Sequence, residues 1–196
     1  MLHPILMPTY GIILYLIGLY VQNPEMPLLY VIIILAGTIF LSCVVPVFAL
    51  LLLRLFGSID SLEMRNRKQR TAPYIFTLLC FGAWIYFLHA LLEIPTFLLV
   101  ICIGALVALF MVTIINIWWK ISAHLTGLGG LFGGICAFAY NFSDFPIYLL
   151  CAVLAIALIL MFARLYIKAH TPLQVVVGFL LGLICTFVPN LFLCYA

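Results

Sequence analysis

The sequence predicts an all-α integral membrane protein: a compact bundle of six to seven transmembrane helices with a functional site at one membrane face. Two observations predict this fold class. Hydrophobic residues make up 68% of the 196 positions and charged residues only 7%, with a mean hydropathy of +1.40. The apolar residues also fall in long runs, and a helix needs about 20 of them to cross the hydrocarbon core. Composition this apolar excludes an ordinary soluble domain.

Seven apolar runs predict the individual helices. We expect them at about 8–22, 28–53, 73–92, 96–119, 125–141, 146–166 and 173–195. The first run is short and the fifth is rich in glycine, so either could be a partial or re-entrant span. Pro46 is expected to kink the second helix, because proline lacks the N–H of a regular helical turn. Residues 1–4 lack the cationic start of a secretory signal, so we expect the first helix to be retained in a single membrane domain over 1–196.

The polar breaks between the runs are of two kinds. Those at 22–27, 93–96 and 141–146 contain proline and one acid each, with no base. The cationic stretches at 58–73, 119–124 and 163–174 have all eight lysines and arginines in or beside them. Two spans separate the first cationic stretch from the second, and two more separate the second from the third. An even number of crossings returns the chain to the same side, so the cationic stretches are expected to share one membrane face.

Pairs of glycines four residues apart predict close helix packing. These pairs are Gly129 with Gly133, Gly130 with Gly134, and Gly178 with Gly182. Small residues at this spacing allow helix backbones to approach closely in lipid. The seven cysteines show neither a CxxC pair nor a metal-site spacing, and the net charge of +3 gives no indication of a nucleic-acid partner.

The second and third cationic stretches carry candidate catalytic residues. Arg164 ends one run and His170 follows it, just before Thr171-Pro172, which is typical of a helix cap and first helical residue. An arginine fork can clamp two phosphate oxygens at once. Ser122 and His124 precede the glycine-rich helix, whose first N–H groups could face an anion. A histidine can transfer protons near neutral pH. Taken separately, each stretch could also be an interfacial cap with side chains that extend to the membrane surface.

The first cationic stretch is harder to assign to single residues. Arg65, Arg67, Lys68 and Arg70 lie within six positions just before Pro73. Some of this charge could set the topology or attract anionic lipid.

Together these residues resemble the type-2 phosphatidic acid phosphatase family, the membrane relatives of bacterial acid phosphatases and vanadium haloperoxidases. The family's second motif, Pro-Ser-Gly-His, is matched by 121–124 with Ile121 and Ala123 in place of Pro and Gly. Its third, Ser-Arg-x5-His-x3-Asp, is matched by 163–174 with Ala163 for Ser and Gln174 for Asp. The resemblance covers about residues 54–182, in the family's order.

The departures concern the first motif and the final acid. The family's Lys-x6-Arg-Pro aligns Arg65 with its lysine but Ala72 with its arginine, so Arg67 and Arg70 are the preferred replacements. Gln174 can orient a histidine through a hydrogen bond, but it carries no charge. Thr171 and Gln174 also fit a helix capping box. Gln174 therefore indicates either a branch of the family that uses an amide in place of the acid, or a protein with reduced catalytic activity. We favour the first interpretation.

The resemblance implies a metal-independent lipid phosphatase that needs no cofactor. His170 would attack phosphorus and form a phosphohistidine, while His124 would protonate the leaving oxygen and then activate water. Arg67, Arg70, Arg164 and Ser122 would hold the phosphate, with Gln174 positioning His170. The substrate would be a lipid phosphate or pyrophosphate: a polyprenyl pyrophosphate, phosphatidic acid, phosphatidylglycerol phosphate or a lipid A phosphate.

Location and competing functions stay open at this point. The resemblance favours a bacterial inner membrane with the site on the outer face, whereas the distribution of basic residues favours the cytoplasmic face. One alternative is a catalytically reduced lipid-phosphate binder or lipid translocase that uses the same pocket. Another is an anion transporter or channel, but the spans contain few polar residues to line a path. The sequence gives no oligomeric state.

Overall fold

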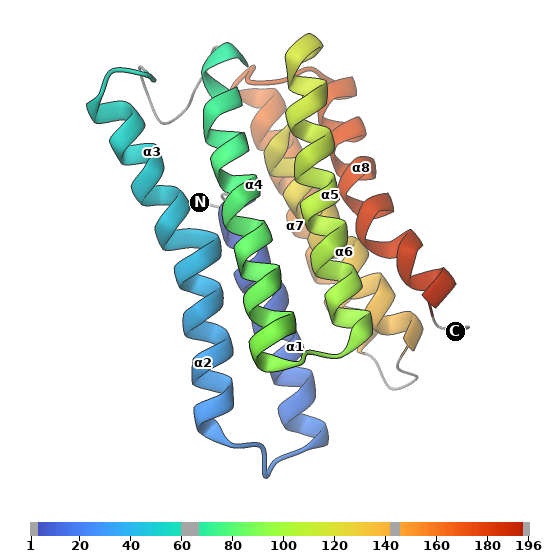
Figure 1. Ribbon diagram of the computed structural model, residues 1–196. Coiled ribbons are helices and arrows are strands. Elements are labelled where there is room, and N and C mark those ends of the chain that lie inside the picture. The colour runs from blue at the N-terminus through green and yellow to red at the C-terminus, as the bar shows by residue number, and fades with distance from the viewer. Residues whose placement is uncertain (1–3, 60–66, 142–145, 194–196) are drawn as a thin grey trace.

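The computed structural model describes residues 4–59, 67–141 and 146–193, and every regular element in these ranges is helical (Figure 1). This part of the chain contains 7 helices that are long and apolar enough to cross a membrane. They confirm the predicted integral membrane bundle, and their boundaries lie within a few residues of the predicted runs. The spans are Pro4–Val21, Leu28–Leu55, Thr71–Leu91, Thr96–Trp118, Ala123–Asn141, Ile147–Tyr166 and Pro172–Phe192.

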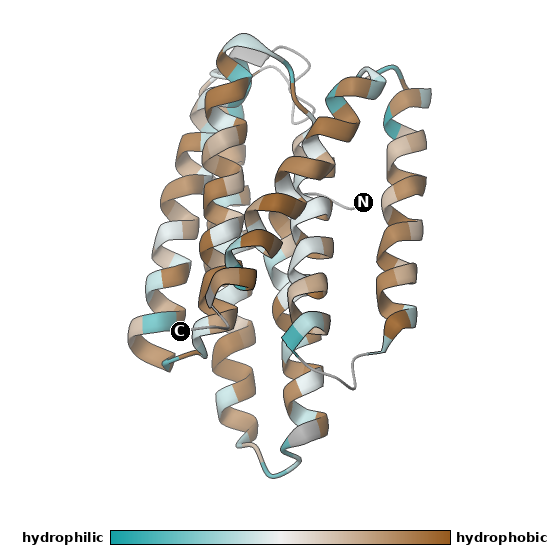
Figure 2. Ribbon diagram, turned by 90° about the vertical axis from the view of Figure 1, so that its right-hand side faces the viewer, coloured by the Kyte–Doolittle hydropathy of each residue, from teal (hydrophilic) through white to brown (hydrophobic). Residues whose placement is uncertain are grey.

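The first and fifth runs form continuous helices. α6 (Ala123–Asn141) runs the full length of its predicted span. α1 (Met7–Gln22) follows a short 3-10 turn, η1 (Pro4–Leu6). Figures 1 and 2 show that the described N-terminus lies partway down the bundle, so α1 begins below the end at which α4 (Thr71–Tyr86) starts.

The second span changes its helical geometry near Pro46, where the sequence predicts a kink. It consists of α2 (Leu28–Ile39), a π-helical turn η2 (Phe40–Val44) and α3 (Val45–Leu55). The turn ends two residues before Pro46, which cannot donate a backbone hydrogen bond to the carbonyl four residues earlier. A buried bond from Trp84 Nε1 to Thr38 Oγ1, 3.0 Å long, ties α2 to α4 beside this turn.

The centre of the bundle is built from α5 (Thr96–Trp118), α6 and α8 (Pro172–Leu193), with α6 and α8 packed most closely. A Cβ atom at Gly129 would strike the Phe179 carbonyl, and one at Gly182 would strike the Thr126 carbonyl. Thr186 Oγ1 donates to the Gly130 carbonyl across the same interface at 2.9 Å. The predicted close packing at the glycine pairs is confirmed, because only hydrogen atoms fit between these backbones.

The bundle is apolar along its length and more polar at its two ends (Figure 2). Large apolar side chains on α2, α3 and α7 (Ile147–Tyr166) are exposed, as expected of helices that face lipid. The described parts of all the cationic stretches lie at one end, where α3, α5 and α7 finish and α4, α6 and α8 begin (Figure 1). This confirms the prediction that the cationic stretches share one face. Glu25 and Glu93 lie at the other end, and Asp144 is outside the described residues.

Candidate functional site

The connection between α7 and α8 places His170 beside Gln174. The predicted cap is confirmed, because α8 begins at Pro172 and Gln174 N donates to Thr171 Oγ1 at 3.4 Å. Gln174 Oε1 accepts from Thr171 N at 3.2 Å and lies 3.1 Å from His170 Nδ1. Gln174 thus serves at once as the capping-box partner and as the hydrogen-bond partner of the histidine ring.

This geometry fixes the tautomer of His170. The Gln174 Oε1 atom can only accept a hydrogen bond, so His170 Nδ1 must donate. The proton of a neutral imidazole then sits on Nδ1, and Nε2 keeps its lone pair. A capping amide therefore orients the ring and leaves one nitrogen free to act as a nucleophile or base.

The electrostatics around His170 favour its neutral form. Burial is the main cause that lowers the pKa of His170, and the charges of Arg70, Lys120 and Arg164 lower it as well. The hydrogen bond that His170 donates to Gln174 acts in the opposite direction, and the combined effect is a pKa of about 4. The ring is therefore uncharged throughout the neutral range. Cations from the three cationic stretches lie close enough to act on one imidazole, which is an arrangement suited to an anion beside that ring.

The predicted Arg70 and Arg164 thus come together at His170. Arg70 follows from η3 (Arg67–Arg70), is buried at 9% exposure, and its guanidinium interacts with Tyr74 on α4. Arg164 lies in the last turn of α7. Arg67 begins η3, but its side chain is outside what the structure describes, as is Arg65.

The predicted Ser122 and His124 lie at the start of α6, next to the third cationic stretch. The Ser122 N–H donates to the Gln174 carbonyl at 3.3 Å, which joins the two stretches directly. The Ser122 hydroxyl is completely buried and has no hydrogen-bond partner among the described residues. Ser122 Oγ is therefore not exposed to a phosphate at the surface of the bundle. His124 lies in the first turn of α6 and is half-buried.

Lys120 is a site residue that the sequence reasoning did not select. Its Nζ donates to the Ala169 carbonyl at 2.8 Å, one residue before His170. Lys120, Lys168, His170 and Gln174 line one open depression at this end of the bundle. The available signal was the position of Lys120 in the second cationic stretch, two residues before Ser122. Among the residues the structure covers, no three His, Cys, Asp or Glu gather as a metal site requires.

No protein-family model, curated protein or solved structure matches this chain.

The charge of residue 174 is expected to control the ionisation of His170. In the Gln174→Asp variant a carboxylate beside Nδ1 should raise the pKa of His170 by about one to three units, because it stabilises the imidazolium. Gln174→Asn is the matched control, since it has the shape of aspartate without the charge. The measurement is an NMR pH titration of the imidazole in the purified protein. Equal pKa values in the two variants would show that charge at position 174 does not act on His170.

Proposed function

We propose that the protein is an integral membrane enzyme that hydrolyses a lipid phosphate or pyrophosphate through a phosphohistidine at His170. The observation that carries the proposal is a neutral histidine with a fixed tautomer among Arg70, Lys120 and Arg164. A nucleophile must keep its lone pair at neutral pH, and a transferring phosphoryl group needs cations to offset its charge. The same residues supply both requirements.

The proposed reaction has two steps. His170 Nε2 attacks phosphorus, the bond from phosphorus to the lipid oxygen breaks, and His124 gives that oxygen a proton. Water then attacks the phosphohistidine, His124 takes a proton from the water, and phosphate leaves while His170 recovers its neutral form. Arg70, Lys120 and Arg164 offset charge on the phosphoryl oxygens during both displacements.

The setting supports a lipid substrate. The depression lies at the membrane end of a bundle whose outer surface is apolar, so a phosphate on a lipid headgroup reaches it from the bilayer. The resemblance supports a bacterial inner membrane with the site at the outer face. The grouping of the basic residues supports the cytoplasmic face instead.

The same pocket could also bind a lipid phosphate without turnover, as a binder or translocase would. The neutral Gln174 favours this second candidate, because an amide stabilises the imidazolium less than a carboxylate does.

Phosphate release and covalent labelling test the proposal. We expect the purified protein, with chelator present, to release phosphate from at least one member of a panel of polyprenyl pyrophosphate, phosphatidic acid, phosphatidylglycerol phosphate and lipid A. Rapid acid-free quenching should trap an acid-labile phosphoryl group on His170, located by mass spectrometry. Binding of a panel lipid with neither release nor labelling would overturn the enzyme and support the binder or translocase.

A further inference from the structure

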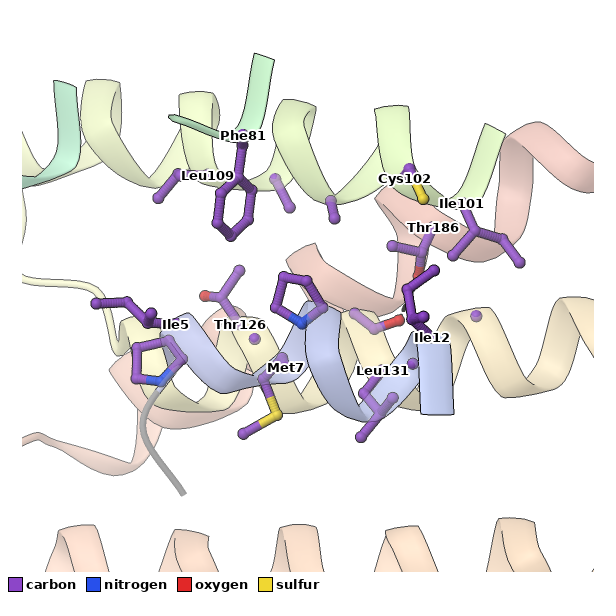
Figure 3. Close-up of a pocket in the computed structure, with 18 of the residues that line it drawn as sticks. Ile5, Met7, Ile12, Phe81, Ile101, Cys102, Leu109, Thr126, Leu131 and Thr186 are labelled. Atoms are coloured by element: carbon purple, nitrogen blue, oxygen red, sulfur yellow. Dashed lines mark hydrogen bonds between the residues drawn. The ribbon is translucent and has the colours of Figure 1, made fainter. Parts of the chain in front are cut away.

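A second feature of the bundle is an apolar cavity between α1 and the helices that it faces. Its volume is about 180 Å³, and its walls come from α1, α4, α5, α6 and α8. Figure 3 shows Ile5, Met7 and Ile12 on one side of it, with Phe81 and Leu109 across from them. The cavity is separate from the open depression at His170.

The three threonine hydroxyls in the wall already make hydrogen bonds within the protein. Thr77 Oγ1 donates to the Pro73 carbonyl at 2.8 Å, Thr126 Oγ1 to the Ser122 carbonyl at 3.1 Å, and Thr186 Oγ1 to the Gly130 carbonyl at 2.9 Å. These hydroxyls therefore need no hydrogen bond from an occupant, and most of the other wall residues are apolar. An apolar cavity of about 150 Å³ stays dry and binds a small hydrocarbon, so the occupant expected here is hydrocarbon rather than water.

The length of the cavity indicates a chain. Along α5 its wall extends from Leu98 to Val112, which is about 21 Å at the helical rise. Half of the hydrocarbon core is only about 15 Å thick. A narrow apolar cavity that extends over this depth suits one extended hydrocarbon chain.

Tyr74 connects the cavity to the candidate site. It lines the cavity, and it interacts with Arg70, whose charge also acts on His170. Ala123 and Thr126 line the same end of the cavity, on either side of His124 in the chain. A lipid with its phosphate at the cations of the site would therefore have its first methylenes beside this opening.

We propose that the cavity holds one hydrocarbon chain of the lipid whose phosphate is bound at His170, with α1 as its outer wall. The substrate class is then a phosphate or pyrophosphate on a single long chain, or a lipid that inserts only one of its chains. This inference rests on the proposed function for the position of the phosphate, but the binding of a chain can be measured without it.

The test has two measurements. The first compares kcat/KM for n-butyl phosphate with kcat/KM for n-dodecyl phosphate. The second compares the Tm of the protein with and without n-dodecanol. The detergent has a rigid steroid body, so that no detergent alkyl chain competes. The variant Ala108→Phe fills the cavity from a buried position on α5, and Ala105→Phe does so from the next turn. Ala155→Phe adds the same ring on the exposed surface of α7 and is the control.

In wild type and Ala155→Phe, we expect kcat/KM for dodecyl phosphate to exceed that for butyl phosphate. Ala108→Phe should lower kcat/KM for dodecyl phosphate at least about tenfold, because two or more methylenes lose their burial. Its kcat/KM for butyl phosphate should change less than about twofold. Dodecanol should raise the Tm of wild type but not of the filled variants.

The outcomes separate the two proposals. If wild type, Ala108→Phe and Ala105→Phe all release phosphate and show the same chain-length preference, the proposal that the cavity holds a hydrocarbon chain is overturned. The proposed phosphatase activity is not affected by that result. No release from any phosphate, with a dodecanol effect on Tm that the filled variants lose, would overturn the phosphatase and support the cavity. Neither release nor a dodecanol effect would overturn both.

Discussion

Replacing His170 with alanine is expected to lower phosphate release by about 10⁴-fold or more, because removal of a covalent nucleophile eliminates the step that it makes possible. We propose His170 as that nucleophile because its ring is neutral, its tautomer is fixed and cations surround it. Binding of the lipid phosphate should persist, since Arg70, Lys120 and Arg164 remain. The measurements are initial rates of release and the dissociation constant of the same lipid.

The matched control is His89→Ala. His89 lies in η4 (Phe87–Leu91), at the opposite end of α4 from Arg70. Its replacement should leave release within about twofold of wild type. A His170→Ala protein that still releases phosphate at a tenth of the wild-type rate would show that another group is the nucleophile.

The His124→Ala variant separates the two roles proposed for the histidines. A missing general acid or base costs about 10²–10⁴-fold with a lipid substrate. With p-nitrophenyl phosphate, whose leaving group needs no proton, the first step should be restored and the second should remain slow. Phosphohistidine should then accumulate on His170. Equal losses with both substrates and no accumulation would contradict the acid–base role of His124.

Substitution of Gly182 by alanine is expected to have the largest effect on stability. The new methyl group would strike the Thr126 carbonyl and press on the Gly130 backbone, and neither can rotate away. Overpacking of this kind typically costs about 1–3 kcal/mol, and a clash with backbone belongs at or above the upper end. The Tm of the purified protein should fall by several degrees. The separation of α8 from α6 should also disturb the bond between Ser122 N and the Gln174 carbonyl.

Gly82→Ala is the control for this substitution, because a Cβ atom there meets nothing within 4 Å. It should leave the Tm unchanged or slightly higher. If Gly182→Ala cannot be purified, Gly178→Ala offers a milder clash, with the Ser122 carbonyl 2.8 Å from the added Cβ. Unchanged Tm values for both Gly182→Ala and Gly178→Ala would refute tight packing at this interface.

Most of the fold was predictable because its main determinant is local. A long apolar run must satisfy its backbone hydrogen bonds within itself in lipid, so run length alone located the helices. The packing of Gly182 against α6 followed from residue size. Counting spans then placed the cationic stretches at one end.

The site was only partly predictable, since it depends on how side chains face one another. The helices are apolar on almost every side, so their sequences carry little information about which face points inward. The spacing of residues along the chain could not show which of Arg67 and Arg70 lies beside His170. It also gave no reason to select Lys120 as a site residue. Both the hydrogen bond of Lys120 to Ala169 and the burial of Ser122 arise where two separate stretches meet.

The amino-acid sequence was enough to predict a membrane bundle, the shared face of its cationic stretches and the glycine contacts, because run length, charge and residue size are properties of local segments. The folded structure was needed to show that Gln174 caps α8 and holds His170 with the same oxygen atom, and that Arg70, Lys120 and Arg164 act on one neutral ring. It also decided that α1 begins below the site and borders an apolar cavity. These properties depend on distances between segments that are far apart in the chain, and such distances are set by packing.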